Sequence, residues 1–247
     1  MKRIINLTFQ PPVAADSWTD VHDATEDGNI CPQYDISTSE PMGDEDCLNL
    51  NVYTPKIDSK KRAVMVYIHG GAFIMGGGAS FFFGPDYLLE QNVVLVTFNY
   101  RLGPLGFLST EDKTAAGNQG LLDQVMVLNW VKENIAKFGG DPDKVTIFGE
   151  DSGAASVTLM AMSPVAKGLF QAAIALSGNA LCDQYLQTTP YEASKELAVR
   201  LECSGDNGKD IIDCLKRKTQ QEIITESQKM FVSIILFFTF RQHSQQE

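Results

Sequence analysis

The sequence predicts an α/β fold in which a mostly parallel sheet carries helices on both faces. Two observations lead to this prediction: short apolar, β-branched runs bounded by turn residues, and longer stretches of helical periodicity between them. Continuous apolar strands that alternate with helices are typical of a parallel sheet that is buried on both faces. A chain of 247 residues is also long enough to bury a sizeable core.

The first strands follow a long irregular segment. Residues 1–46 are rich in Pro, Asp and Ser and predict mostly loop. Ala63–His69 (AVMVYIH) and Val93–Asn99 (VVLVTFN) are β-branched runs that predict buried strands. The next stretch predicts a helix, because its apolar residues recur at helical spacing, and Gly139-Gly140 would end this helix. The apolar residues are Leu121, Leu122, Val125, Leu128 and Ile135.

The remaining elements alternate and then become helical. In chain order we expect a strand, a helix, a strand and two further helices at Val145–Phe148, Ala155–Met162, Ala172–Leu176, Tyr191–Leu201 and Lys209–Arg217. The apolar run Met230–Phe240 is too short to cross a bilayer as a helix, so we expect no membrane span.

Charge and cysteine spacing exclude several classes of function. The formal net charge of −11 repels nucleic-acid phosphates, so we expect no nucleic-acid partner. No Cys/His cluster has metal-ligand spacing, and we expect neither a metal nor a cofactor. Cys31 with Cys47 and Cys203 with Cys214 are short separations that could each close a disulfide. Spacing alone is equally compatible with unrelated thiols.

The segment Val145–Ser156 (VTIFGEDSGAAS) carries the clearest chemical signal. A strand, the pentapeptide GEDSG and a helix predict a nucleophile elbow, a tight turn that presents its central side chain at the carboxyl edge of a sheet. The helix N-terminus favours an anion at that point. The central residue is Asp151 and not serine. Ser152 lies one residue late, so we expect its hydroxyl to point elsewhere while its backbone N–H still faces the anion site.

A second signal is the glycine-rich stretch Tyr67–Ser80 (YIHGGAFIMGGGAS), which directly follows a predicted strand. Consecutive small residues allow backbone N–H groups to turn toward one point, as an oxyanion hole requires. The alternative is a loop that is merely flexible. Because the stretch follows a buried strand and is paired with an elbow, we favour the oxyanion hole.

Together these motifs resemble the type-B carboxylesterases, which include cholinesterase-like enzymes and insect esterases. The resemblance covers about residues 9–218 and is carried by EDCLNLNVYTP, YIHGGAF, NYRLGPLGFL, GNQGLLDQ, NWVKENIAKFGGDPDKVTIFGE and the elbow. It implies an α/β-hydrolase fold with a Ser–Glu–His triad. It also implies that residues 1–218 are the N-terminal part of a carboxylesterase domain and that residues 219–247 are a divergent tail.

Position by position, the resemblance implies roles for named residues. The oxyanion donors would be Gly71, Ala72 and Ser152. The family's first two disulfides would be Cys31–Cys47 and Cys203–Cys214, which would leave Cys182 unpaired. The resemblance further implies secretion, although the N-terminus has no signal-peptide pattern. In a secreted protein, Asn6-Leu7-Thr8 would be a glycosylation acceptor.

Three departures from the family bear on activity. Asp151 occupies the position of the nucleophilic serine. We expect a truncated sheet, because the segments that would carry the acid and the histidine of the triad, and the family's leading strands, are missing from this sequence. Of the histidines, His69 belongs to the glycine-rich turn, whereas His22 and His243 lie in loop and tail, so we expect none to act as a general base.

Asp151 could itself be a nucleophile, because haloalkane dehalogenases and epoxide hydrolases have a similar Gly-x-Asp-x-Gly arrangement. The ester so formed would need histidine-activated water, and the surrounding motifs are esterase-like, so we do not favour this alternative. We expect instead that the carboxylate of Asp151 occupies the anion site and that N–H hydrogen bonds keep it ionised.

The sequence leaves three hypotheses for function. By family, the chain is a carboxylic ester hydrolase that acts on small-molecule esters, and Asp151 predicts that it is catalytically impaired or inactive. The first alternative is a non-catalytic, cholinesterase-like protein that binds or adheres to a protein partner. The second alternative is a non-functional fragment.

Overall fold

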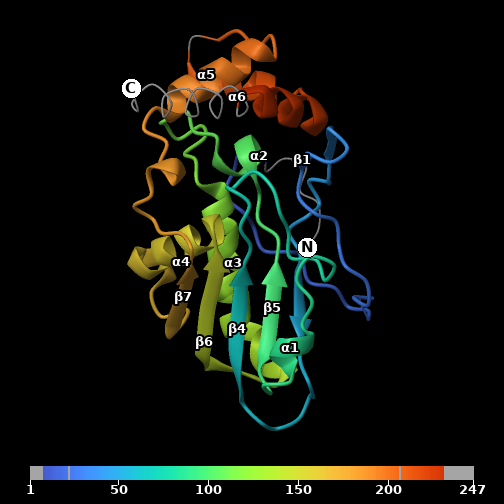
Figure 1. The fold of residues 1–247 in the computed structure, drawn as a ribbon. Helices are drawn as coiled ribbons and strands as arrows, with labels where there is room; N and C mark the ends of the chain where they lie inside the picture. Colours follow the sequence, from blue (N-terminus) through green and yellow to red (C-terminus); the bar gives the residue numbers. More distant parts are fainter. Residues whose placement is uncertain (1–7, 22, 206, 231–247) are drawn as a thin grey trace.

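The computed structural model describes residues 8–21, 23–205 and 207–230 (Figure 1). Its main sheet has five strands in the order β3-β5-β4-β6-β7. In chain order these strands are β3 Leu50–Tyr53, β4 Arg62–Ile68, β5 Val94–Phe98, β6 Gly140–Glu150 and β7 Ala172–Leu176. β4 is parallel to β5 and β6, and β6 is parallel to β7, whereas β3 runs antiparallel to β5. The sheet is therefore mostly parallel, as predicted.

The four predicted strands correspond to β4, β5, β6 and β7, and β6 begins at Gly140 rather than at Val145. The edge strand β3 was not predicted from the sequence. Its four residues are all half-buried. Apolar and polar residues alternate through Leu48–Val52, the pattern of a half-buried strand, but this short alternation was interpreted only as part of a family motif. A small separate hairpin is formed by β1 (Gln33–Asp35) and β2 (Glu40–Met42) within the segment that was predicted to be mostly loop.

The helices are α1 Asp86–Leu89, α2 Gly103–Phe107, α3 Gln119–Asn134, α4 Ser152–Met162, α5 Pro190–Arg200 and α6 Gly208–Leu215. The last four match predicted helices. α3 continues as a single 3₁₀ turn and ends at Gly139, whose φ of 80° is a left-handed conformation that glycine adopts without strain.

Residues 220–230 are also helical, in a segment that was expected to be part of a divergent tail. The backbone N–H of Thr219 donates to the Glu222 carboxylate (2.7 Å), and the N–H of Glu222 donates to the Thr219 hydroxyl (3.2 Å). This capping box was readable in the sequence. Ile223 and Ile224 bury the inner face of the helix against α5 and α6. Most of the apolar run Met230–Phe240 lies outside the described residues.

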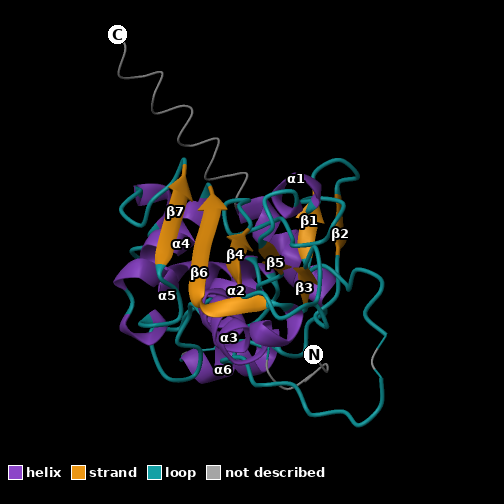
Figure 2. Cartoon of the chain, turned by 90° about the horizontal axis from the view of Figure 1, so that it is seen from below, coloured by secondary structure: helices purple, strands orange, loops and turns teal. Residues whose placement is uncertain are grey.

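One face of the sheet packs against α3 and α4. The main core combines Val64, Val66, Ile68, Val145 and Ile147 of the sheet with Val127, Leu128 and Val131 of α3 and Val157 and Met160 of α4. Figure 2 shows α3 and the short α1 on opposite sides of the sheet. On the face opposite α3, the ring of Tyr67 packs against Phe83 and Phe148 at centroid distances of 4.5 and 5.0 Å.

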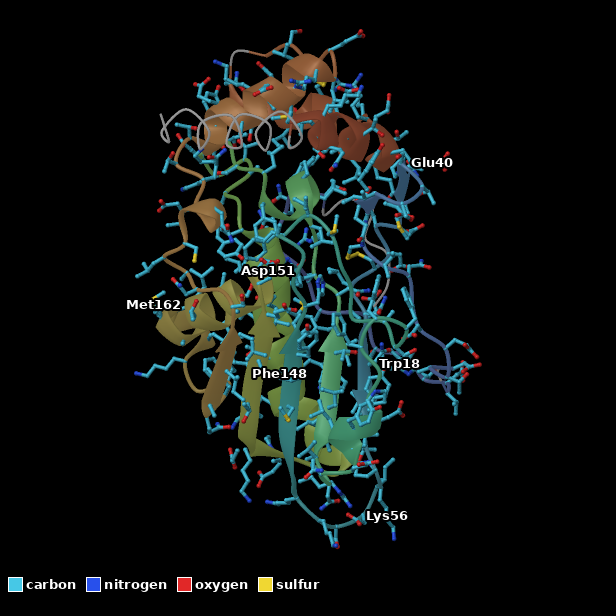
Figure 3. The ribbon with its side chains drawn as sticks, in the orientation of Figure 1. Trp18, Glu40, Lys56, Phe148, Asp151 and Met162 are labelled. Atoms are coloured by element: carbon cyan, nitrogen blue, oxygen red, sulfur yellow. A yellow bond between two sulfur atoms is a disulfide. The ribbon has the colours of Figure 1, made fainter. Side chains whose placement is uncertain are left out.

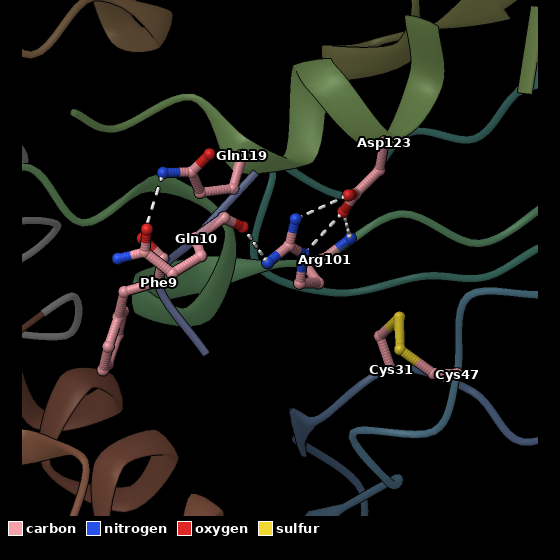
Figure 4. Close-up of polar contacts among 7 residues, drawn as sticks. All are labelled: Phe9, Gln10, Cys31, Cys47, Arg101, Gln119 and Asp123. Carbon is pink, nitrogen blue, oxygen red and sulfur yellow. Dashed lines mark hydrogen bonds and ion pairs between the residues drawn. A yellow bond between two sulfur atoms is a disulfide. The ribbon is translucent and has the colours of Figure 1, made fainter. Parts of the chain in front are cut away.

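A buried ion pair holds α3 against the end of β5 (Figure 4). The guanidinium of Arg101 donates to both oxygens of Asp123 at 2.8 and 2.7 Å, and the Asp123 side chain is 1% exposed. Arg101 also donates to the carbonyl of Gln10 at 2.8 Å, and Gln119 donates to the carbonyl of Phe9 at 3.2 Å. These bonds attach the N-terminal segment to α3.

Both predicted disulfides are present. Cys31 is bonded to Cys47 in the N-terminal region, and Cys203 is bonded to Cys214, which joins the end of α5 to α6. Cys182 is the free cysteine, as the resemblance implied. Among the residues that the structure describes, no helix has the length and apolar character needed to cross a membrane.

Candidate active site

The loops that follow β4, β6 and β7 meet at one edge of the sheet. β4 leads into the glycine loop, residues 70–78; β6 leads into the elbow, residues 149–153; and β7 leads into residues 177–186. The three strands are parallel and point the same way in Figure 1. Figure 3 shows Asp151 just beyond their carboxyl ends. Ligand sites of open parallel sheets lie at this edge.

The elbow presents Asp151 from a strained backbone. Asp151 has φ 55° and ψ −122°, between the end of β6 and the first residue of α4. The turn is tight because strand and helix nearly touch: a Cβ on Gly149 would lie 2.6 Å from the carbonyl carbon of Gly153. The N–H of Asp151 donates to the carbonyl of Leu176 at 3.1 Å, which links the elbow to the end of β7.

The glycine loop directs two backbone donors at the Asp151 side chain. The N–H groups of Gly71 and Ala72 each lie 2.9 Å from Oδ2 of Asp151. Gly71 and Ala72 both have positive φ, 113° and 54°, and Phe73 continues the turn at 61°. The two N–H groups converge on one oxygen, which is the geometry that stabilises an oxyanion in acyl transfer.

Tyr185 binds the other oxygen of the carboxylate. Its hydroxyl donates to Oδ1 of Asp151 at 2.5 Å. Its ring packs edge-on against Phe73 of the glycine loop, with centroids 5.6 Å apart. Tyr185 was not predicted from the sequence, because this residue lies 34 residues after Asp151 in a segment that carries no motif. No local signal could have found it.

Hydrogen bonds determine the charge state of the Asp151–Tyr185 pair. Burial by itself raises the pKa of Asp151, but the bonds from Tyr185, Ala72 and Gly71 outweigh it and lower the pKa to about 2. Burial and the bond to Asp151 together raise the pKa of Tyr185 to about 12. At neutral pH the site therefore holds an ionised carboxylate and a protonated phenol.

The hydroxyl of Ser152 is not available to replace a catalytic serine. Ser152 is fully buried, and its Oγ accepts the backbone N–H of Phe73 at 3.2 Å. Its own backbone N–H contributes to the lowered pKa of Asp151. The side chain is thus engaged away from the carboxylate, while the backbone N–H faces it.

His69 is the only histidine in the part of the chain that the structure describes, since His22 and His243 lie outside it. It is 1% exposed, and burial lowers its pKa to about 4. Its Nδ1 lies 2.9 Å from the carbonyl of Gly70, and its ring stacks on Tyr100 at 4.3 Å. His69 is a neutral core residue, and the hydrogen bonds of Asp151 do not include it. No group of three His, Cys, Asp or Glu side chains among the described residues is arranged to hold a metal.

Several known proteins are similar in sequence to this chain. The model of the carboxylesterase family matches residues 4–244. Juvenile hormone esterase of Tribolium castaneum is 47% identical over 86% of this chain and 37% of its own length. Bile salt-activated lipase of Rattus norvegicus is 45% identical over 85% of this chain and 36% of its own length. Neuroligin-2 of Mus musculus is 38% identical over 88% of this chain and 31% of its own length.

Solved structures agree with the sequence matches. The structure of juvenile hormone esterase from Manduca sexta, with OTFP covalently attached, superposes with a TM-score of 0.82 at 33% identity, over 89% of this chain and 43% of that chain. The predicted α/β-hydrolase fold is therefore confirmed. The chain spans about two fifths of the length of the curated relatives that it matches.

Proposed function

The chain belongs to the carboxylesterase family, and on that premise we propose that it is a catalytically impaired member, whose anion site is filled by its own Asp151 carboxylate. The observation that carries the proposal is the pair of 2.9 Å hydrogen bonds from Gly71 and Ala72 to Oδ2. In ester hydrolysis, such donors stabilise the charge that develops on the substrate's carbonyl oxygen. Here they are already saturated by a permanent negative charge, which also repels a developing oxyanion.

The nucleophile is also changed. Ester hydrolysis in a serine esterase requires an alcohol that an imidazole can deprotonate. The central residue of the elbow is a carboxylate with a pKa of about 2, so it is a weak base and a poor nucleophile toward an ester. Ser152 is buried and hydrogen-bonded to the glycine loop, and His69 is neutral, buried and hydrogen-bonded to Gly70 rather than to Asp151. These contacts support impaired hydrolysis of small-molecule carboxylic esters.

A second candidate function is binding of a protein partner without catalysis. Similarity to neuroligin-2 of Mus musculus, a relative whose name is not that of an esterase or lipase, favours it, together with oxyanion donors that Asp151 already occupies.

We also propose that the protein is secreted. Two disulfides within the described residues support this proposal, because disulfides persist mainly in oxidising compartments.

The proposal can be tested with a fluorescent fluorophosphonate, which labels activated serines. The purified chain is incubated with the probe beside bile salt-activated lipase as a positive control, and p-nitrophenyl acetate hydrolysis is measured on the same samples. We expect labelled lipase, no adduct on this chain and no hydrolysis above the buffer rate. A stoichiometric adduct on the peptide that contains residues 149–153 would overturn the proposal.

A further inference from the structure

We propose that the N–H groups of Gly71 and Ala72 and the hydroxyl of Tyr185 form a carboxylate-binding cradle, in which Tyr185 is the residue that closes and positions the site. In the natural chain the cradle is filled by Asp151. This inference rests on the proposed function, because that proposal places the Asp151 carboxylate in the site. Two things are new: the role of Tyr185 and the class of ligand, a carboxylate, which the oxyanion geometry alone does not provide.

The number and placement of the donors distinguish a carboxylate from an oxyanion. Gly71 and Ala72 bind a single oxygen, Oδ2, and this suffices for the one charged oxygen of a tetrahedral intermediate. The Tyr185 hydroxyl binds the second oxygen, Oδ1. The donors from Gly71, Ala72 and Tyr185 engage both oxygens of one planar group, which matches a carboxylate, whose charge is shared by both oxygens. The backbone N–H of Ser152 adds a further bond to the same carboxylate.

Tyr185 is held in place by the segment that carries it. After β7, the N–H of Ala180 donates to the hydroxyl of Thr158 on α4 at 2.8 Å. Asn179 then accepts the N–H of Leu181 at 2.8 Å, and the N–H of Tyr185 donates to the carbonyl of Cys182 at 3.0 Å. The segment is thus anchored to the helix that follows the elbow.

The glycine loop provides the second support. The ring of Tyr185 packs edge-on against Phe73, and the N–H of Phe73 donates to the hydroxyl of Ser152 at 3.2 Å. The aromatic contact keeps the hydroxyl at the carboxylate, so the donors of the glycine loop and of the segment after β7 are fixed relative to each other. The lowered pKa of Asp151 and the raised pKa of Tyr185 are the electrostatic consequence of this arrangement.

The decisive experiment empties the cradle. Asp151→Gly removes the side chain at a position with φ 55°, which glycine adopts without strain. The vacancy matches acetate, whose methyl and carboxylate groups replace the deleted atoms. Acetate is titrated at neutral pH while the amide resonances of Gly71 and Ala72 are followed by NMR, with sodium chloride at equal ionic strength as the control. We expect saturable shifts with acetate in Asp151→Gly and none in the natural chain.

The role of Tyr185 is tested in the emptied cradle. In Asp151→Gly, adding Tyr185→Phe retains the ring that packs on Phe73 but removes the hydroxyl. We expect acetate to bind about tenfold more weakly, the usual effect of losing one hydrogen bond to a charged group. Tyr34→Phe is the matched control, because the Tyr34 hydroxyl donates to the carbonyl of Ser39, outside the cradle. This control should leave acetate affinity unchanged.

A measurement on the natural cradle covers the case in which Asp151→Gly does not fold. In the single variant Tyr185→Phe, the pKa of Asp151, followed by the ¹³C shift of its carboxyl carbon, should rise from about 2 toward its ordinary value. An unchanged pKa, an acetate affinity indifferent to the Tyr185 hydroxyl, or no saturable acetate shift in folded Asp151→Gly would each overturn the inference. The fluorophosphonate assay remains independent: an adduct would refute the proposed function without deciding whether the emptied site binds acetate.

Discussion

A Cβ atom on Gly153 would lie 2.1 Å from the carbonyl oxygen of Ile68, because the first turn of α4 is pressed against the end of β4. The contact is between backbone atoms, so no side-chain rotation can relieve it. It brings the elbow and the glycine loop together, and the short bonds between Asp151 and the loop depend on it.

Gly153→Ala is therefore expected to destabilise the protein by about 3 kcal/mol, near the upper end for overpacking, because two backbone segments must separate. Urea denaturation of the variant and the natural chain measures this difference. Gly168→Ala is the control: Gly168 has φ 81° but no atom within 4 Å of its would-be Cβ. Its cost is limited to backbone strain of about 1 kcal/mol. Equal losses in the two variants would contradict the close-contact argument.

Asp151→Ser should restore an alcohol to the elbow without restoring acyl transfer. The substitution frees the N–H groups of Gly71 and Ala72, but no described histidine hydrogen-bonds to the elbow, and an unassisted hydroxyl is a weak nucleophile at neutral pH. We expect no burst of p-nitrophenol from p-nitrophenyl acetate and no acyl adduct by mass spectrometry. Asp151→Ser/Ser152→Ala should behave identically. A stoichiometric burst would show that a general base lies within reach.

His69 predicts a loss of stability in mild acid. Burial lowers its pKa from 6.5 to about 4, so between these values the unfolded chain binds a proton that the folded chain does not. The contribution of neutral His69 to the free energy of unfolding is complete above pH 6.5. It declines as the pH falls to 4, by up to about 3 kcal/mol. Urea titrations from pH 7 to pH 4 measure the slope. His69→Gln should flatten it regardless of the variant's own stability, and an unchanged slope would exclude His69 as its source.

Asp123→Ala is expected to reduce the free energy of unfolding by about 3–4 kcal/mol, because it removes one partner of a buried ion pair. Three hydrogen bonds from Arg101 end on this carboxylate. The matched control is Asp143→Ala, which removes an ion pair with Lys132 whose Asp143 side chain is 77% exposed. Exposed pairs contribute little, so this variant should unfold near the natural chain. Chemical denaturation compares the two, and similar losses would contradict the role assigned to burial.

Elements whose signal is local were predictable from the sequence. The strands β4, β5 and β7 are short apolar runs flanked by turn residues, and α3 has a clear helical period ended by glycine. β3 was missed although Leu48, Leu50 and Val52 alternate with asparagines, because this short alternation was interpreted only as part of a family motif. The helix at residues 220–230 was missed although Thr219 and Glu222 form a capping box, because its apolar residues were interpreted as part of a tail.

The residues of the candidate site also differ in whether a local sequence pattern predicts them. The sequence by itself determined that a carboxylate stands at the centre of a nucleophile elbow and that small residues follow β4, because turn geometry depends on adjacent residues. Only the tertiary structure decided which donors reach that carboxylate. Tyr185 arrives from a segment beyond β7, and its hydrogen bond depends on where parallel strands end relative to one another, which no local pattern encodes.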